Sequence, residues 1–316
     1  MRPVPLLAGL LVALAALSLF TGVSSLTPRA VLTDPEAARL MLVSRVPRTL
    51  AALLAGCALA VSGQIMQMLA RNRFVEPMTA GAGQSAALGV LLATILLPGA
   101  AIWAKMGLAA LAALAGSAGL MALIRPLPPT QPLLVPLVAL VYGGMIGAAV
   151  TFVAYQGDLL QYVEVWLTGE LSGVLKGRYE LLWLAGATAA ATWVIADRVT
   201  LLALGDAAAR GLGLNVTLVT AAGLAAISLS TALVVVTLGA IPFVGLVVPN
   251  LVARYTGDNL RAALPLTALT GAALVLAADI AARVIRQPFE IPVAAITGIL
   301  GSGLFLLLLY RGRARA

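Results

Sequence analysis

The feature that most constrains this chain is a succession of long apolar runs that are almost free of charge. Of its 316 residues, 61% are hydrophobic and only 10% are charged, whereas an ordinary soluble domain carries charge on about a quarter of its residues. A helix needs roughly 20 apolar residues to cross a bilayer. The composition therefore predicts an all-α, polytopic membrane protein and leaves little sequence for a soluble domain.

Ten apolar segments are candidate transmembrane helices, separated by loops that contain charge, proline or glycine. We expect the polar stretch 24–44 to be a loop that can include one short amphipathic helix, and 5–23 to be a retained span rather than a cleaved signal peptide. The segment 244–256 is short, so we expect it to gain residues from 239–243. The expected spans are 5–23, 46–70, 78–98, 101–123, 132–155, 180–197, 217–238, 244–256, 264–284 and 291–310.

The charged residues between these segments predict the orientation. With the N-terminus in the cytoplasm, the inner side receives eleven basic and four acidic residues, and the outer side receives nine basic and eight acidic residues. Inner loops of membrane proteins carry the excess of Lys and Arg. An even number of spans then places both termini in the cytoplasm.

Several functions are excluded or disfavoured by what the sequence lacks. It has no histidine and a single cysteine, Cys57, which leaves no multi-cysteine metal site, and we expect neither cofactor nor bound metal. Without histidine, an intramembrane hydrolase is also disfavoured. No G-x-x-x-x-G-K-[ST] motif is present, so this chain is not itself a P-loop ATPase. Basic residues occur singly, as topology determinants do, and nucleic acid is not an expected partner.

Ionisable residues are nearly absent from the spans themselves. The main exception is Asp279, which stands four residues before Arg283, so pairing on one helix explains it. A transporter driven by an ion gradient usually places ionisable groups near the middle of the membrane. Their absence favours energy supplied by another subunit.

Small-residue stripes within the spans favour tight helix packing, with a subunit interface as a further use. They are Ala51, Ala52 and Gly56, Gly116 and Gly119, and Gly143 and Gly147.

Two pairs of arginines lie at the predicted outer ends of spans. Arg45 and Arg48 flank Val46-Pro47, and Pro47 fits a first helical turn; Arg283 and Arg286 repeat the three-residue spacing. One interpretation is that these cations extend into lipid headgroups. The other is a docking surface for a partner that carries carboxylates, because Arg–carboxylate pairs give both attraction and register.

The stretch 71–77 (Arg-Asn-Arg-Phe-Val-Glu-Pro) and the following Gly81-Ala-Gly83-Gln-Ser85 form a second polar segment. Its glycines match G-x-G-x-x-A, but a dinucleotide site requires a preceding strand, and this segment follows a membrane helix. Irregular backbone at membrane depth is tolerated where it lines a cavity or is buried in protein. We therefore expect a turn beside the translocation path.

The third polar segment, 204–214, lies on the predicted cytoplasmic side. We expect Asp206 to act as N-cap of a helix over 207–210, which the following glycines end. A helix this short is marginal in water, so it is better explained if it packs into a groove on another protein. An ordinary short loop helix is the alternative.

Taken in order along the chain, these motifs resemble the FecCD-type permeases, the membrane subunits of ABC importers for iron–siderophore complexes, haem and cobalamin. The motifs that carry the resemblance are Arg45-Val-Pro-Arg48, Ser62-Gly63, Gln67, Asn72, Glu76-Pro77, Leu204-Gly205, Leu212-Gly213, Gly239-Ala-Ile-Pro-Phe243, Gly245-Leu-Val-Val-Pro249, Arg261, Asp279, Arg283 and Glu290.

The resemblance implies the architecture of a type II ABC importer permease, with ten helices in a single transmembrane domain over residues 1–316. It implies coupling helices at about 200–216 that seat in the ATPase, with Leu204, Gly205, Asp206, Ala209, Arg210, Leu212 and Gly213 as contact residues. The outward arginines Arg45, Arg48, Arg283 and Arg286 are expected to receive glutamates of a binding protein. The residues expected at the pathway or at a helix turn are Asn72, Glu76, Pro77, Gly81, Gly83, Pro249 and Asn250.

The expected partners are a second permease subunit, two ATP-binding subunits, a periplasmic or lipoprotein substrate-binding protein and membrane lipids. The expected location is the bacterial cytoplasmic (inner) membrane. Val-Pro249-Asn250 stands where many members have Val-Pro-His, and Gly301-Ser-Gly-Leu-Phe305 replaces the commoner Gly-x-Pro-x-Phe. Both variants resemble the siderophore branch, in which two different permeases often pair.

The sequence therefore favours a ferric-siderophore permease that forms a heterodimer with a paralogue. A cobalamin or haem permease is the alternative within the family. An ATP-independent secondary transporter and a structural membrane scaffold are the alternatives outside it.

Overall fold

The computed structural model describes residues 3–22, 26–127, 134–257 and 259–313, and this part of the chain is helical with no strand. The all-α prediction is confirmed, and each predicted span has its helix. The ten longer helices are α1 (Pro3–Phe20), α4 (Val46–Leu69), α5 (Ala82–Leu96), α6 (Ile102–Ile124), α7 (Leu134–Gln156), α9 (Leu181–Ala203), α11 (Val216–Leu238), α12 (Val244–Thr256), α13 (Leu260–Val284) and α14 (Val293–Arg313).

The lengths of the helices are those of a membrane protein. Among the described residues, five helices are long and apolar enough to cross a membrane unaided, and the stretch Pro35–Leu69 is the longest of them. By contrast, α12 has 13 residues and is about 20 Å long at 1.5 Å per residue. The residues 239–243, which we expected to lengthen it, form a non-helical link instead. Phe243 at the end of this link has a left-handed backbone (φ 68°). Val244, the first residue of α12, is fully buried, so α12 begins within the protein.

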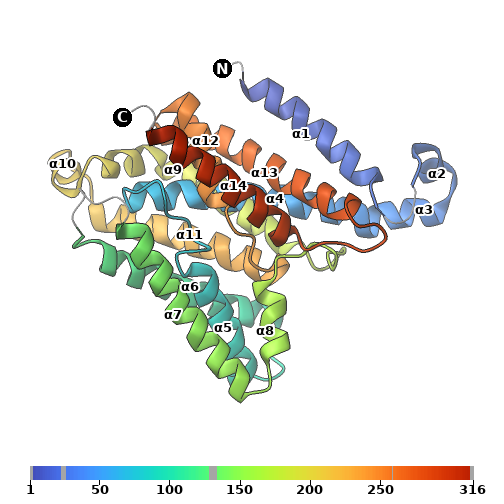
Figure 1. The fold of residues 1–316 in the computed structure, drawn as a ribbon, viewed down its shortest axis with the longest axis horizontal. Helices are drawn as coiled ribbons and strands as arrows, with labels where there is room; N and C mark the ends of the chain where they lie inside the picture. The colour runs from blue at the N-terminus through green and yellow to red at the C-terminus, as the bar shows by residue number, and fades with distance from the viewer. Residues whose placement is uncertain (1–2, 23–25, 128–133, 258, 314–316) are drawn as a thin grey trace.

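Helix α4 is the centre of the bundle. It packs against α13, α9, α11 and α12, and 17 of its 24 residues are buried. Figure 1 shows α4 running through the middle of the molecule, with α13 and α14 across its near face. A helix surrounded in this way needs small side chains on several faces, because without water there is no hydrophobic drive and contact depends on close packing.

Glycines allow the backbones around α4 to touch. A Cβ atom on Gly56 would lie 2.3 Å from the carbonyl oxygen of Gly271 on α13, and one on Gly63 would lie 2.0 Å from that of Gly245 on α12. No larger residue fits at either contact. The predicted stripe of Ala51, Ala52 and Gly56 is therefore a packing face within the bundle.

A second group of helices, α5, α6 and α7, lies beside this centre, with α5 and α6 in extensive contact. It occupies the lower part of Figure 1 together with α8 (Leu160–Leu167). The other small-residue stripes pack here. A Cβ on Gly116 would meet the Ser85 side chain at 2.0 Å, and one on Gly143 would meet the Thr79 carbonyl oxygen at 2.8 Å.

Two connecting regions differ from the sequence-based expectation. The stretch 24–44 contains two short helices rather than one, α2 (Pro28–Thr33) and α3 (Pro35–Leu40), followed by a π-helical turn, Met41–Arg45, that leads into α4. Thr27 and Asp34 cap the two helices through their side chains, and the proline after each cap fits the first turn. Helix α8 was not predicted.

The fold has two distinct ends. The short helix α10 (Asp206–Gly211) lies at one end, and α2 and α3 lie at the opposite end (Figure 1). We call these the inner end and the outer end, after the predicted orientation. The terminal residues 1–2 and 314–316 lie outside the described residues, so their predicted position is not addressed by the structure.

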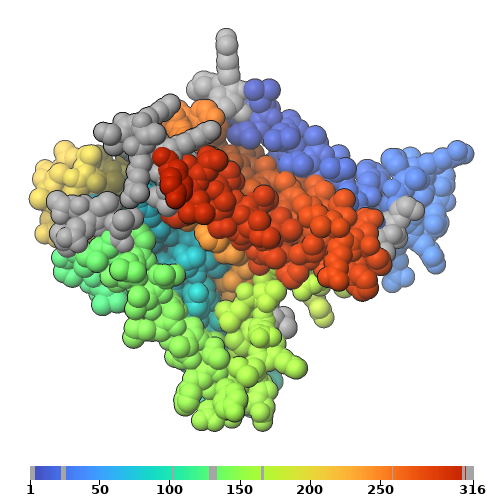
Figure 2. Space-filling view, viewed as in Figure 1, coloured from blue at the N-terminus to red at the C-terminus, as the bar shows by residue number. Residues whose placement is uncertain are grey.

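Much of the surface between the two ends is apolar. On α7, the exposed side chains include Leu137, Leu140, Met145 and Phe152, each more than half exposed. Figure 2 shows α7 and α8 in green and α14 in red on one face of the molecule. An apolar surface of this extent is expected where lipid or another membrane subunit replaces water.

The glycine contacts yield a stability prediction. Gly56→Val should lower the free energy of unfolding by about 3 kcal/mol, at the upper end of the overpacking range, because α4 and α13 must separate. Thermal unfolding in detergent measures it. The control is Gly144→Val on α7, where a Cβ meets nothing within 4 Å. Equal melting temperatures for the two variants would contradict the tight contact between α4 and α13.

Candidate functional site

The polar residues singled out in the sequence gather at the two ends of the bundle. At the inner end, the chain leaves α4 through the segment Arg71–Pro77, which we call the inner turn. Arg71 has a left-handed backbone (φ 48°), which is uncommon for a residue other than glycine. The buried Asn72 stabilises the reversal: its N–H donates to the Gln67 carbonyl at 2.9 Å, and its Oδ1 accepts from the N–H of Phe74 at 2.9 Å.

The inner turn is bonded to two helices from the C-terminal part of the chain. The Asn250 side-chain amide on α12 donates to the carbonyl oxygens of Arg73 and Leu246, both at 2.7 Å. The ring of Phe74 meets that of Phe305 on α14 edge to face, with 5.8 Å between centroids. The turn is therefore a fixed part of the packing of α12 and α14 rather than a loose connection.

Glu76 anchors the far end of the inner turn. Its side chain is buried, with 1% of its surface exposed, and its Oε1 accepts from the N–H of Phe243 at 2.9 Å. Phe243 is the residue before α12, so the carboxylate lies at the N-terminal end of that helix. Burial raises the pKa of this carboxyl to about 7, and the backbone N–H groups of Phe243, Gly245 and Leu246 at the start of α12 oppose that rise.

The predicted helix over 207–210 is present as α10, but its capping differs from the prediction. The N-cap residue is Gly205, at φ 115°, and no side chain caps the helix. Asp206 is instead the first helical residue, and its carboxylate pairs with Arg71 and lies 4.0 Å from Arg210. The N-cap prediction for Asp206 is therefore wrong, because a guanidinium from the inner turn takes the carboxylate.

Apolar side chains flank α10 on the surface. Ala209 is fully buried and holds the helix to the bundle, whereas Leu204 and Leu212 are 67% and 63% exposed. Gly213 follows with a left-handed backbone (φ 78°) and ends this segment. The inner end thus presents one exposed leucine before the short helix and one after it.

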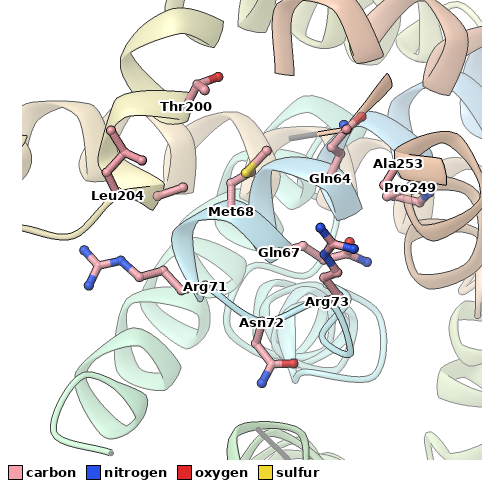
Figure 3. A pocket seen from close by; sticks show the side chains of 12 residues that line it. Gln64, Gln67, Met68, Arg71, Asn72, Arg73, Thr200, Leu204, Pro249 and Ala253 are labelled. Carbon is pink, nitrogen blue, oxygen red and sulfur yellow. The ribbon is translucent and has the colours of Figure 1, made fainter. Parts of the chain in front are cut away.

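A cavity of about 290 Å³, which we call the inner cavity, lies beside the inner turn at the inner end of the bundle (Figure 3). In Figure 3, Arg71 extends toward the side of Leu204, whereas Arg73 and Gln67 lie on the side of Pro249. The cavity thus joins the ends of α4, α9 and α12. Its lining residues are Gln64, Gln67, Met68, Arg71, Asn72, Arg73, Thr200, Ala203, Leu204, Pro249, Ala253 and Gly257.

The residues predicted at the pathway divide between this cavity and the packing around it. Asn72 and Pro249 line the cavity, and Asn250 binds the inner turn beside it. Glu76 and Pro77 are buried against the start of α12. Gly81 caps α5 with a left-handed backbone, and Gly83 lies in the first turn of that helix against Met78.

At the outer end, the four predicted arginines do not share one exposed surface. Only Arg286, among these four, is exposed, and its guanidinium lies 5.8 Å from the ring centre of Phe289. Arg45, Arg48 and Arg283 are buried, with 8%, 7% and 2% of their surface exposed. The physical reason is that carboxylates and carbonyl groups of the same chain surround them.

We call Arg48, Asp279, Arg283 and Glu290 the outer charged cluster. Asp279 is fully buried and binds both arginines, with Arg48 Nη2 at 2.8 Å and Arg283 Nη2 at 2.6 Å. The pairing of Asp279 with Arg283 was predicted from their spacing. Glu290, which binds Arg48 Nη1 at 2.8 Å, was not predicted as a partner, because it is 242 residues away in the sequence.

The outer charged cluster also holds the end of α1. Arg283 donates from Nη1 to the carbonyl oxygens of Ser18 at 3.0 Å and Thr21 at 2.7 Å, and Arg45 also donates to Thr21. These carbonyl groups at the end of α1 have no partner within a helix, and cations stabilise helix C-termini. The sequence offered no indication that Ser18 or Thr21 would be the acceptors.

Comparison with known proteins gives one family over nearly the whole chain. A model of the FecCD transport family matches residues 10–311. The petrobactin import system permease protein YclN of Bacillus subtilis is 42% identical over 309 residues, which cover 97% of this chain and 98% of the relative. The ferric-anguibactin transport system permease protein FatD of Vibrio anguillarum is 39% identical over 300 residues, which cover 95% of this chain and 96% of the relative.

The fold has a close counterpart among solved structures. An inward-facing conformation of a protein described as a metal-chelate type ABC transporter superposes with a TM-score of 0.82 at 27% sequence identity. The superposition covers 98% of this chain and 99% of that chain. The likeness therefore extends over the whole helical arrangement and not over one motif.

The outer charged cluster yields a prediction that separates buried from exposed ion pairs. Asp279→Asn should lower the free energy of unfolding by about 3–5 kcal/mol, because two buried guanidinium groups lose their shared carboxylate. Thermal unfolding in detergent measures it. The control is Asp197→Asn, which breaks the exposed pair with Arg261 at 2.7 Å and should cost at most about 1 kcal/mol. If both variants melt alike, the cluster does not hold the outer end together.

Proposed function

The chain belongs to the FecCD transport family, and we propose that it carries ferric siderophores across the cytoplasmic membrane. The family is one of ABC importer permease subunits, which are transport components rather than enzymes. The observation that carries the siderophore assignment is the 42% and 39% identity, over almost the full length, to permeases named for petrobactin and ferric anguibactin.

The inner end supports coupling to an ATPase. Leu204 and Leu212 offer apolar side chains at the surface on either side of α10, and Ala209 fixes the helix from below. Two exposed apolar side chains that flank a short helix at the inner end are better explained by a groove on a partner than by contact with water. The proposed coupling residues are Leu204, Gly205, Asp206, Ala209, Arg210, Leu212 and Gly213.

The outer end supports docking of a substrate-binding protein, with different roles for the four arginines. Arg286 is exposed and is the proposed direct contact for a carboxylate of that partner. Arg45, Arg48 and Arg283 are buried, so their proposed role is to fix the loop around Glu290 and the end of α1, and with them the docking surface. Attraction between opposite charges would increase the rate of docking and set its register.

The proposed assembly contains two permeases, two ATP-binding subunits and one substrate-binding protein, with the second permease a paralogue of this chain. Residues 1–316 form a single transmembrane domain in this proposal, placed in a bacterial inner membrane with both termini in the cytoplasm. ATP binding on the partner subunits would move α10 and shift the bundle between two packings. The translocation path through the permeases would bind the bulky chelate only weakly.

Transport by the reconstituted assembly tests the proposal. We expect proteoliposomes that contain the permease pair, the ATPase and the binding protein to take up ferric siderophores only when ATP is present with the ATPase. Cobalamin and haem serve as competing cargoes. Uptake driven by an ion gradient without the ATPase, or uptake of cobalamin or haem in place of siderophores, would refute the siderophore importer.

The coupling surface yields a prediction for Leu212. Leu212→Glu should reduce association with the ATPase at least tenfold, because a charge then replaces an apolar contact, and the exposed position should leave the fold intact. Co-purification from membranes measures association, and thermal unfolding checks the fold. The matched control is Leu32→Glu on α2 at the outer end, where the leucine is 87% exposed. Equal ATPase association for the two variants would disprove the coupling role of Leu212.

The docking surface yields a prediction for Arg286. Arg286→Glu should weaken binding of the substrate-binding protein about tenfold and reduce the dependence of that binding on salt, because an attractive charge becomes repulsive. Titration of the purified components at two salt concentrations measures both effects. Arg198→Glu at the inner end is the control for charge reversal. Unchanged affinity and salt dependence for Arg286→Glu would remove Arg286 from the docking surface.

A further inference from the structure

Helix α10 needs a physical connection to the rest of the bundle if its movement is to reach the helices around the inner cavity. It follows α9 directly and contacts the ends of α9 and α11, and Ala209 is its buried anchor. A distant part of the chain contacts α10 as well. The guanidinium of Arg71 donates to the carboxylate of Asp206, which is 135 residues away in the sequence.

Arg71 contacts two consecutive pieces of the coupling region. Its Nη2 donates to the carboxylate of Asp206 on α10 and, at 3.3 Å, to the carbonyl oxygen of Leu202 near the end of α9. A positively charged donor at the end of α9 also complements the helix dipole. One side chain therefore holds the junction between α9 and α10 from the side of the inner cavity.

The backbone of Arg71 is held in a conformation that costs energy. Its φ of 48° is left-handed, and non-glycine residues in that region are found mainly where the surrounding structure imposes them, often at functional sites. Here the N–H groups of Arg71 and Asn72 donate to the carbonyls of Met68 and Gln67. These bonds fix the direction in which the Arg71 side chain leaves the turn.

The other end of the connection is rigid. The inner turn is bonded to α12 through Asn250 and Glu76 and packs on α14 through Phe74. The inner turn thus connects Arg71 to α12 and α14, and α12 lines the inner cavity at Pro249 and Ala253.

The pair of Arg71 and Asp206 is too exposed to be explained by stability. The two side chains are 43% and 44% exposed, and exposed ion pairs contribute little to folding. The pair of Arg71 and Asp206 is therefore better explained by the parts that it joins, the inner turn and α10, than by a contribution to stability.

We propose that Arg71 is the positioning residue that passes the movement of α10 to the inner turn, and through it to α12 and α14. The inference rests on the proposed function, because it assumes that a partner ATPase drives α10. It adds a link within this chain, in which the ion pair with Asp206 transmits the displacement and the bonds of the inner turn spread it to the cavity wall.

The test measures siderophore molecules transported per ATP hydrolysed in proteoliposomes with the complete importer. Arg71→Asn removes the guanidinium but keeps a residue that tolerates the left-handed backbone. We expect association with the ATPase at the wild-type level and continued ATP hydrolysis, with the transport ratio reduced at least fivefold. Arg71→Asp, which places a like charge beside Asp206, should lower the ratio further.

The control is Arg261→Asn, which breaks another exposed arginine–aspartate pair at the inner end, between α13 and α9, and should keep the wild-type ratio. An unchanged ratio in Arg71→Asn would overturn the inference. Loss of ATPase association in Arg71→Asn would make Arg71 a docking residue instead. Failure of the proposed function is distinguishable, because wild-type protein would then show no ATP-dependent uptake.

Discussion

The close contact of backbones along α4 is the constraint on which the rest of the structure depends. In a membrane, helices gain little from hiding apolar surface from each other, so their association depends on dense packing. Gly56 against Gly271 and Gly63 against Gly245 bring α13 and α12 as near to α4 as backbones allow. The positions of the inner turn and of the outer charged cluster follow, since both are attached to the ends of α4.

The two ends of α4 carry polar interactions of different kinds. At the outer end, Asp279 is fully buried and shared by two arginines, and removing one partner from such a group costs several kcal/mol. At the inner end, Arg71 and Asp206 are about half exposed, so their contact is inexpensive to break. Buried charges therefore hold the outer end together, whereas the exposed pair at the inner end adds little to stability.

This asymmetry agrees with the division of labour in an ABC importer. The family to which the chain belongs is one of ABC importer permease subunits, which are transport components that work with partner subunits. Asp279 is the acidic residue that lies well inside a predicted span, and two arginines pair with it. The inner cavity, by contrast, is lined by the inner turn and by residues of α4, α9 and α12.

The sequence by itself determined the helical class, the ten apolar segments and the family, because membrane spans and family motifs are properties of contiguous residues. It also predicted the pairing of Asp279 with Arg283, because these two residues are about one helical turn apart in the sequence. Only the tertiary structure decided that Arg48 and Arg283 are buried, that Glu290 binds Arg48 and that Arg71 takes Asp206 from its predicted capping role. Each of these contacts joins residues far apart in the chain, and their partners are set by how helices pack around α4, which no local pattern encodes.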